Sequence, residues 1–544
     1  MPGFGHHDRV PEALRSTGRV SVAVLASRVL GLAREILFAS LFGAGAVADA
    51  YTVAFRIPNL LRDLLAEGAL SSAFVPTFTA TLQQDGEDRA HALGNLTLSA
   101  LLVVTGVLTL VGMWQSEAIV VAISRGFGDD PYRVALAARL TRVMMPILAL
   151  VSLGAVWMGM LNARRRFMIP ALAPAVFNVV SLVAGVGIWI VGASVERGVM
   201  LWSLGTLAAG LAQALGQLPA LWRLGYRPRL RLRGVLRDPG IVRIARLMAP
   251  ALVGLAAIQI NIFVNTGFAG SLGHGAVAQL GYAFRLFFLP LGVFGVALAT
   301  VTTTHVSEEA ARGDLSALAR RVAESASAGW MLTSASAVGL GLLAVPVTTL
   351  VYRHGQTSLA DAEAIAFVLQ AYVLGLLPYS LVKIFAPAFY SVDRPRIPLL
   401  ASAAAVVSNI TFNALTYRQL GAPGIALGTG VGAVVNVLVL RVAFVQVIGP
   451  MPGDRRVARL GALVLANGLM AAAVWGAWTG AQHLGAAVGI VGQPTLWLAS
   501  TLVVVIGLGF GVYVGVLRGL GYPGADLLWS LPGRSLWRVW PRRD

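Results

Sequence analysis

The sequence predicts an all-α polytopic membrane protein with about fourteen transmembrane helices. Of its 544 residues, 57% are hydrophobic and only 12% are charged, and the mean hydropathy is +0.76. An ordinary soluble domain is about 25% charged. Apolar windows of about 20 residues, the length that crosses a bilayer as a helix, recur from one end of the chain to the other. No stretch between them is long enough for a sizeable soluble domain.

The predicted spans follow one another with short polar breaks between them. The first begins near Val20, after a polar start that lacks the apolar core and cleavage site of a removable signal peptide. The predicted limits are 18–42, 47–81, 92–123, 134–161, 170–193, 199–222, 240–270, 276–307, 322–351, 362–391, 397–416, 423–447, 457–480 and 494–517.

The arginine-rich loops all fall on one side when the fourteen spans are threaded alternately across the membrane. They include NARRRF at 162, the segment 223–238 and the C-terminal RSLWRVWPRRD, whereas the opposite loop at 270 is poor in arginine. Basic loops stay in the cytoplasm, so both termini are expected there. Topology and attraction to anionic membrane lipids therefore account for the net charge of +18, and nucleic acid is not expected as a partner.

Two sequence matches indicate an internal repeat. GAGAVADAYTVAFR at 43 matches GHGAVAQLGYAFR at 273, and NARRRFMIP ending at Pro170 matches SVDRPRIP ending at Pro398. Six predicted spans separate the copies, and an even number gives both halves the same direction through the membrane. We therefore expect two parallel six-helix lobes related by a pseudo-twofold axis, followed by two extra helices. The expected parts are an N-terminal lobe 1–222, a basic cytoplasmic linker 223–239, a C-terminal lobe 240–450 and a region 451–544 with the last two helices and a basic tail.

The first two predicted spans contain many charged residues. Arg28 and Arg34 lie about 13 and 22 Å along a helix that starts near residue 19. A charge at the centre of a membrane helix costs about 2.5–3.5 kcal/mol, so these residues are expected to face water, partners or both.

Spacing offers partners to some of these charges. Two helical turns place Glu35 on the face of Arg28, and Arg56 on the face of both Asp49 and Asp63. One interpretation is that these pairs merely lock two helices together. Against it, Arg34 and Arg62 have no acid at this spacing and are expected to remain as surplus positive charge.

The second half adds Arg285, Lys383 and Arg441 to its spans, with no acid in the span interiors. A hydrated cavity lined by both halves would be cationic, and arginine suits phosphate and carboxylate groups because its planar fork binds them bidentately. Pro58 and Pro290 each follow a copy of the repeated A-F-R and are expected to act as hinges. The predicted substrate is therefore an anion.

Several chemistries lack the residues that they need. The chain has no cysteine, no HExxH pair and no GxxxxGK[ST] loop, so no metal site, cofactor or direct use of ATP is expected. An intramembrane glycosyltransferase would need acids near the outer surface, where GDDPYR at 128 is more typical of a turn. We do not expect an enzyme.

Long motifs resemble a known family. SRVLGLARE at 27, FGAGAVADAYTVAFRIPNLLRDLLAEGALSSAFVP at 42, AFRLFFLPLGVFGVALAT at 283 and VKIFAPAFYSVDRPRIP at 382 are similar to the MurJ (MviN) family of lipid II flippases, in the MOP exporter superfamily. The resemblance implies two lobes around a central cavity and a groove for the undecaprenyl tail along the last two helices. The implied substrate-binding residues are Arg28, Arg34, Arg62, Arg285, Asp49, Asn59, Ser27 and Glu67, with Glu35, Arg56 and Lys383 as further candidates.

The resemblance also implies the function. The cavity would hold the diphosphate headgroup of lipid II while the lobes alternate between inward-open and outward-open states in the inner membrane, with the membrane potential giving direction. Proteins of cell-wall synthesis or division would be partners. The alternatives are a related MOP exporter, either a flippase for another polyprenyl-linked saccharide or a multidrug antiporter, and a scaffold of the division machinery.

Overall fold

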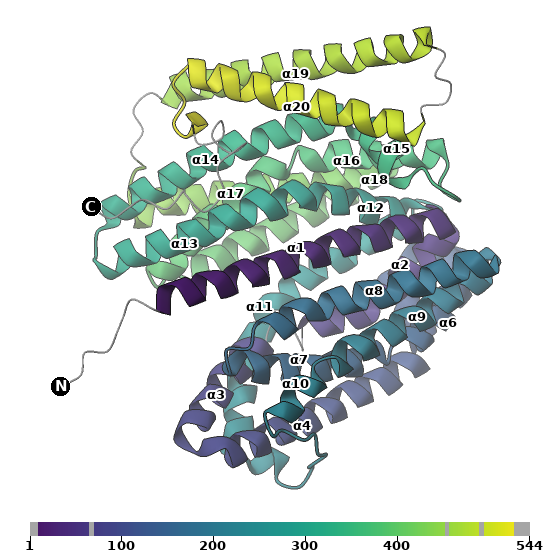
Figure 1. Ribbon diagram of the computed structural model, residues 1–544, viewed down its shortest axis with the longest axis vertical. Coiled ribbons are helices and arrows are strands. Elements are labelled where there is room, and N and C mark those ends of the chain that lie inside the picture. The colour runs from purple at the N-terminus through teal and green to yellow at the C-terminus, as the bar shows by residue number, and fades with distance from the viewer. Residues whose placement is uncertain (1–8, 65–69, 452–455, 489–493, 527–544) are drawn as a thin grey trace. The chain divides into compact units, whose positions relative to one another are not determined.

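The structure is a computed structural model that describes residues 9–64, 70–451, 456–488 and 494–526, and within these ranges every regular element is a helix (Figure 1). Contacts divide the chain into two compact units. Unit 1 is Met1–Ala278 with His354–Ser358, and unit 2 is Gln279–Arg353 with Leu359–Asp544.

Unit 1 contains the first eleven α-helices and two short 3-10 helices. They are α1 (Arg9–Phe42), α2 (Ala46–Arg62), α3 (Leu70–Gln84), α4 (Gly86–Trp114), α5 (Ser116–Ile123), η2 (Arg125–Asp129), α6 (Pro131–Met144), α7 (Ile147–Ala163), α8 (Met168–Val191), α9 (Val195–Leu215), α10 (Leu218–Arg223), η3 (Val235–Arg237) and α11 (Pro239–Gly270).

Unit 2 contains nearly all of α12 and the helices that follow it, with one π-helical segment. They are α12 (Ala276–Pro290), the π-helix η4 (Leu291–Gly295), α13 (Val296–Ala311), α14 (Leu315–Leu342), α15 (Ala344–Tyr352), α16 (Leu359–Val373), α17 (Leu376–Ser391), α18 (Arg396–Val447), α19 (Arg456–Ala487) and α20 (Thr495–Gly519).

Most predicted spans correspond to one helix or to consecutive helical segments, and the predicted spans 397–416 and 423–447 both lie in α18. Proline and glycine account for breaks: Pro146 lies between α6 and α7, and Gly421 interrupts α18 with φ 63° and ψ −150°. Within the described residues, eight helices are long and apolar enough to cross a membrane, or ten if two bent helix pairs each count as one span. The all-helical membrane fold is therefore confirmed, and the count of fourteen is approximate.

The internal repeat reappears in the local backbone. Helices α2 and α12 both begin at the A-V-A of the first match, after Gly43 (φ 68°) and Gly273 (φ 100°). In the second match, Arg165 (φ 59°) and Asp393 (φ 56°) hold equivalent positions and are the described non-glycine residues with positive φ. A left-handed residue is uncommon outside glycine, so its recurrence at matching positions supports a duplication.

Unit 1 has a buried apolar core between α3, α4 and α7, which includes Phe74, Phe78 and Trp157. Helix α11 packs mainly against α3. By its contacts, α11 therefore belongs to unit 1, although the predicted C-terminal lobe begins at residue 240. That predicted lobe boundary follows the sequence repeat and stays a prediction.

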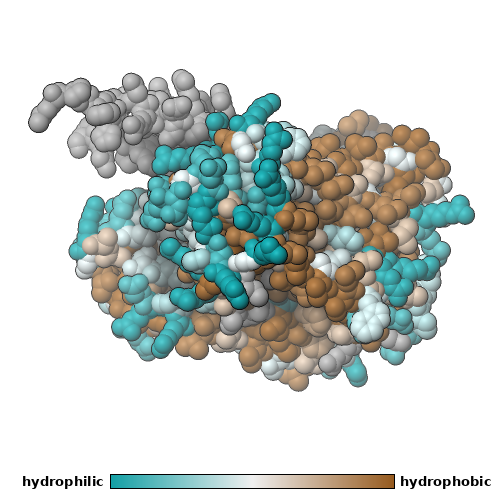
Figure 2. All heavy atoms as spheres, turned by 90° about the horizontal axis from the view of Figure 1, so that it is seen from below, coloured by the Kyte–Doolittle hydropathy of each residue, from teal (hydrophilic) through white to brown (hydrophobic). Residues whose placement is uncertain are grey.

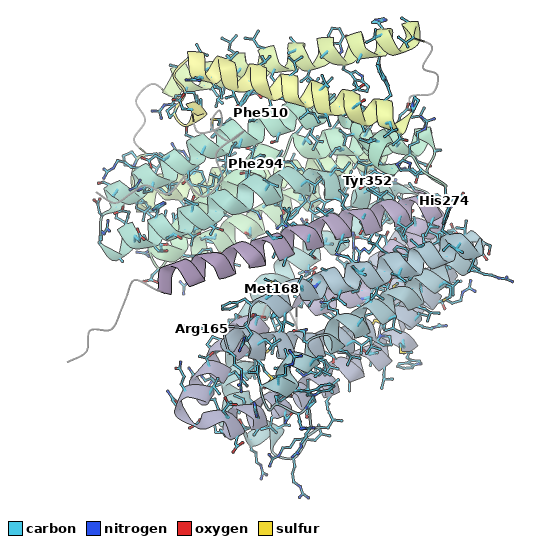
Figure 3. The ribbon with its side chains drawn as sticks, in the orientation of Figure 1. Arg165, Met168, His274, Phe294, Tyr352 and Phe510 are labelled. Carbon is cyan, nitrogen blue, oxygen red and sulfur yellow. The ribbon has the colours of Figure 1, made fainter. Side chains whose placement is uncertain are left out.

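The helix ends of unit 1 can be followed in Figure 3, where Arg165 and His274 lie at opposite ends of the helices of this unit.

The segment His354–Ser358 is also part of unit 1, because Gln356 N donates to Ser40 O at 2.8 Å and Thr357 Oγ1 donates to Ala39 O at 2.8 Å.

Unit 2 has two apolar cores. One lies between α14, α17 and α18 and contains Phe385, Phe389 and Phe444, and the other joins α14 to the antiparallel pair α19 and α20.

On the face shown in Figure 2, hydrophobic side chains cover a broad area and hydrophilic side chains gather beside it. Exposed apolar surface of this extent is expected where helices face lipid.

Replacing Gly432 of α18 with alanine is expected to destabilise unit 2. The new Cβ would lie 2.8 Å from the carbonyl oxygen of Ala405, a backbone atom with little room to move, and overpacking of this kind costs about 1–3 kcal/mol. Gly507→Ala on α20 is the matched control, because nothing lies within 4 Å of its added Cβ. Thermal unfolding in detergent should give a lower Tm for Gly432→Ala than for Gly507→Ala, and equal values would contradict this packing.

Candidate functional site

The first candidate residues lie on α1. Arg28 is exposed, whereas Ser27 is buried and its carbonyl oxygen accepts a hydrogen bond from Asn178 Nδ2 of α8 at 3.0 Å. One turn and a half further along, Arg34 lies over the ring of Phe177, with its guanidinium carbon 5.4 Å from the ring centre. These contacts with α8 hold this part of α1 in place, and the side chain of Arg28 stays exposed.

The prediction that Arg34 and Arg62 carry surplus positive charge is wrong. Arg34 Nη2 lies 2.8 Å from Glu35 Oε1, and Arg62 Nη2 lies 2.9 Å from Asp63 Oδ1. Sequence neighbours do not normally face each other on a helix, which is why spacing missed both pairs. Long arginine side chains can bend back to an adjacent acid. Both pairs are partly exposed, at 14% and 15% for the first and 25% and 33% for the second.

Asp49 is fully buried in α2 and is surrounded by donors within unit 1. Its Oδ2 accepts from Gly275 N at 2.7 Å and its Oδ1 accepts from Ala278 N at 2.8 Å. These amides lie at the start of α12, where the first N–H groups of a helix have no partner within the helix. Arg133 Nη1 lies 3.8 Å from Oδ2 and adds positive charge. Asp49 therefore acts here as a cap for a helix end, not as a carboxylate paired with Arg56.

Arg133, which the sequence analysis missed, holds several groups together near this cap. Its Nε donates to Asp130 Oδ2 at 2.8 Å, its Nη1 donates to Gly273 O at 2.9 Å, and its guanidinium lies over the ring of Phe127. His274 Nε2 lies 3.0 Å from Asp130 Oδ2. Burial opposes ionisation of Asp130, but the hydrogen bonds from Arg133 and His274 outweigh it and lower the pKa of this carboxyl.

The cytoplasm-facing half of α2, in the predicted topology, carries a polar group that contacts α11. Asn59 Nδ2 donates to Asp63 Oδ2 at 3.4 Å, and Gln259 Nε2 of α11 approaches the same oxygen at 3.5 Å. One turn from Asn59, Arg56 donates to the hydroxyl of Thr266. Gln259 and Thr266 lie far along the chain, so only the fold brings them to α2.

Unit 2 holds the remaining basic candidates. Arg285 is exposed on α12, and Lys383 Nζ of α17 lies 5.7 Å from the ring centre of Phe288, one turn after Arg285. Phe288 therefore receives a cation–π contact from Lys383. Two cationic side chains are thus presented from neighbouring helices.

The two candidate hinges differ in geometry. Pro58 lies inside α2 and is buried, and the helix continues past it to Arg62. Pro290 is the last residue of α12 and is followed directly by the π-helical turn Leu291–Gly295. π-Helical turns are frequent at functional sites. Glu67, a predicted substrate-binding residue, lies outside the described residues.

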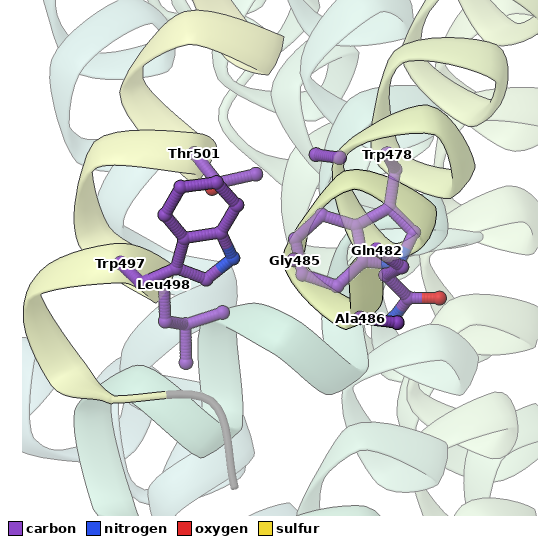
Figure 4. Close-up of a pocket in the computed structure, with 8 residues that line it drawn as sticks. Trp478, Gln482, Gly485, Ala486, Trp497, Leu498 and Thr501 are labelled. Atoms are coloured by element: carbon purple, nitrogen blue, oxygen red, sulfur yellow. The ribbon is translucent and has the colours of Figure 1, made fainter. Parts of the chain in front are cut away.

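A small cavity lies between α19 and α20, the helix pair for which the family resemblance implies a tail groove. Its volume is about 220 Å³, and its walls include the indole rings of Trp478 and Trp497 (Figure 4). Gly485 lacks the Cβ that would lie 3.3 Å from Trp497 Nε1. Its lining combines apolar side chains with the polar groups of Gln482 and Thr501.

The described residues contain no group of three or more His, Asp or Glu side chains that could hold a metal ion.

Replacing Asp49 should destabilise unit 1. Asp49→Ala leaves two buried N–H groups without an acceptor, and each unsatisfied group costs about 1–3 kcal/mol. Asp49→Asn keeps one acceptor oxygen and should fall between the alanine variant and the wild type. Thermal unfolding in detergent measures the order, with Glu117→Ala as the control because Glu117 is an exposed acid. The cap is refuted if Asp49→Ala unfolds at the same temperature as Glu117→Ala.

The lowered pKa of Asp130 predicts a pH dependence of stability. A depressed folded-state pKa stabilises the fold above the ordinary value of 3.8, and this contribution is lost as the pH falls through the folded pKa. The difference in unfolding free energy between wild type and Asp130→Asn should therefore be largest near neutral pH and shrink in acid. Chemical unfolding at several pH values measures it, and the exposed neighbour Asp129, changed to Asn, controls for net charge. A difference that does not change with pH would contradict the hydrogen bonds described here.

Comparisons with known proteins show which family the chain resembles. The model of the family described as "Lipid II flippase MurJ" matches residues 38–491. A lipid II flippase MurJ of Burkholderia cenocepacia is 34% identical over 457 residues, which are 83% of this chain and 88% of that protein. A solved structure, "Lipid II flippase MurJ, inward closed conformation", has a TM-score of 0.75 at 22% identity and covers 92% of this chain and 99% of its own.

The fold is also shared with transporters of another family. An inward-facing multidrug resistance MATE family transporter of the MOP superfamily has a TM-score of 0.63 at 19% identity, over 77% of this chain and 93% of its own. The family match and the apolar helices together show a multi-pass protein of the bacterial inner membrane. The chain belongs to the MurJ family.

Proposed function

We propose that this protein moves lipid II from the cytoplasmic to the outer leaflet without changing its covalent bonds. The observation that carries the proposal is the membership of the MurJ family together with the basic residues on α1 and α2 that the family motif contains. Lipid II carries a diphosphate and peptide carboxylates. Moving such a group through hydrocarbon requires a polar route and positive partners.

The proposed headgroup ligands are Arg28, Arg34, Arg62 and Arg285, and the family resemblance adds Asn59 and Glu67 to this set. Their contacts suggest different parts in binding. Arg28 and Arg285 are exposed, and Arg34 and Arg62 form ion pairs with adjacent acids. A diphosphate would compete with those acids for the guanidinium forks, because phosphate accepts the same bidentate hydrogen bonds.

Three other candidates take supporting parts in this proposal. The contacts of Asp49 and Ser27 support helix positioning rather than contact with the substrate. Lys383 joins Arg285 as a second cation of the C-terminal half, since its ammonium lies against Phe288.

Transport would follow alternating access, with the two halves of the sequence moving between inward-open and outward-open states. Pro58 and the Pro290–η4 junction are the proposed hinges, since irregular segments at corresponding positions of two halves mark transport sites. An inside-negative potential contributes about 2.3 kcal/mol per elementary charge per 100 mV to outward movement of an anion. Voltage therefore provides direction without ATP.

The undecaprenyl tail would stay in lipid beside α19 and α20, with the cavity between Trp478 and Trp497 holding part of it. Both termini face the cytoplasm in this proposal, because the arginine-rich loops then lie on the cytoplasmic side. The partners are anionic membrane lipids at these loops and proteins of cell-wall synthesis or division, which supply or use lipid II.

Growth of bacteria depleted of their own lipid II flippase tests the proposal. Wild-type protein should restore growth, and Arg28→Ala, Arg62→Ala and Arg285→Ala should not, at equal amounts in the membrane. Arg28→Lys should restore growth only partly, because lysine keeps the charge but not the planar fork. Arg312→Ala is the control, since this arginine is 68% exposed in a predicted loop.

Rescue by all three alanine variants at the wild-type level would contradict the headgroup site. Failure of the wild type itself, when it is present in the membrane, would contradict lipid II transport and favour another substrate of a MOP exporter.

A further inference from the structure

The segment between α10 and α11 is basic and contains an exposed stretch without helical structure. Six arginines lie between residues 223 and 237 with no acid among them. Residues 227–233 have no helical structure, and every side chain in that range is exposed. We call Arg227–Arg233 the Arg–Leu strap. It belongs to unit 1, as does α4, beside which it lies (Figure 1).

Side chains of α4 hold the backbone of the strap. Arg229 N donates to Asn95 Oδ1 at 3.0 Å, and Arg231 N donates to Ser99 Oγ at 2.8 Å. Asn95 Nδ2 donates in turn to Arg227 O at 3.4 Å. These hydrogen bonds use the backbone of the strap and leave its side chains available.

Both ends of the strap are anchored as well. Tyr226, directly before it, is fully buried, with its ring 5.5 Å from that of His91. Asp238, after it, caps α11 through Gly240 N and pairs with Arg89 at 2.8 Å. The strap is therefore a fixed surface of unit 1.

The strap is amphipathic. The amides of Arg229 and Arg231, two residues apart, both bond to α4. Successive side chains of such an extended chain point to opposite sides, so Arg229 and Arg231 share one side and Leu230 and Leu232 the other. The two leucines are 74% and 62% exposed. Exposed leucines beside a group of positive charges are better suited to the boundary between lipid headgroups and acyl chains than to water.

The position of the anchors on α4 agrees with that boundary. The span predicted from the sequence begins at residue 92, so Asn95 and Ser99 lie about 5 and 10 Å further along the helix. Helix α4 is one of those long and apolar enough to cross a membrane. In the proposed topology this end of α4 is cytoplasmic.

We propose that the Arg–Leu strap is a docking surface for anionic phospholipid headgroups of the cytoplasmic leaflet. Its arginines bind the lipid phosphates, and Leu230 and Leu232 enter the acyl boundary. Charge complementarity supports this occupant, because the cytoplasmic leaflet is negatively charged and arginine binds phosphate bidentately. A soluble acidic partner would explain the arginines but not the leucines. This inference rests on the proposed orientation, but not on the transported substrate.

The absence of cysteine from the sequence gives a direct test. Leu232→Cys in the full-length protein provides one site for a polarity-sensitive fluorophore. The labelled protein is placed in lipid nanodiscs of phosphatidylcholine alone or with increasing phosphatidylglycerol. We expect a blue shift and quenching by spin-labelled acyl chains that grow with phosphatidylglycerol. Leu415→Cys, on a 73% exposed residue of α18, is the control and should not respond to headgroup charge.

A second protein carries Leu232→Cys with Arg229→Gln and Arg231→Gln. The dependence of the blue shift and quenching on phosphatidylglycerol should weaken about fivefold for each arginine removed. Each basic residue near the surface contributes about 1 kcal/mol to the attraction between protein and anionic lipid. The proposal is overturned if the fluorophore stays in water in both lipids, or if the arginine changes leave the response unaltered.

Neither measurement involves lipid II, so these outcomes are separate from those of the growth test. Labelling of Leu232→Cys in intact cells by a membrane-impermeant thiol reagent would overturn the cytoplasmic location of the strap, and labelling only after permeabilisation supports it.

Discussion

A charged side chain inside a membrane needs water, an opposite charge or a fixed dipole, and this constraint governs the first two helices. The chain meets it in three ways. Arg34 and Arg62 pair with the acids that follow them, Asp49 accepts hydrogen bonds from the start of α12, and Arg28 remains exposed. In the proposed site, the exposed Arg28 would bind a ligand without breaking either of the two ion pairs named here. A candidate binding site and a structural cap thus arise from the same charged stretch.

The buried carboxylate of Asp49 links the repeat to the site. The G-x-G before α12 brings two backbone amides to Asp49, and Arg133 lies between this carboxylate and Asp130. Helix N-termini favour negative charge, which is why an acid is tolerated at a fully buried position. Because α2 also carries Arg56 and Arg62, fixing its first turn sets the position of the basic residues further along it.

Much of the fold follows from the sequence because hydropathy, proline and glycine act locally. The repeat predicted equivalent helices, and α2 and α12 begin at equivalent residues. The pairing of charges was harder to predict. Spacing selects residues on one helix face, so it missed Arg34 with Glu35 and could not find Arg133, which approaches Asp49 only after folding. For the same reason, the packing of α11 against α3 could not be predicted from the sequence.

In the proposed mechanism, arginines of α1 and α2 hold the headgroup of lipid II during transport. Translocation of fluorescent lipid II by purified protein in sealed vesicles tests it most directly, with and without an imposed potential. We expect transport by the wild type that becomes faster with the potential, and no transport by a folded Arg28→Ala, Arg62→Ala double variant. Wild-type rates from that variant, with an unchanged Tm, would contradict it.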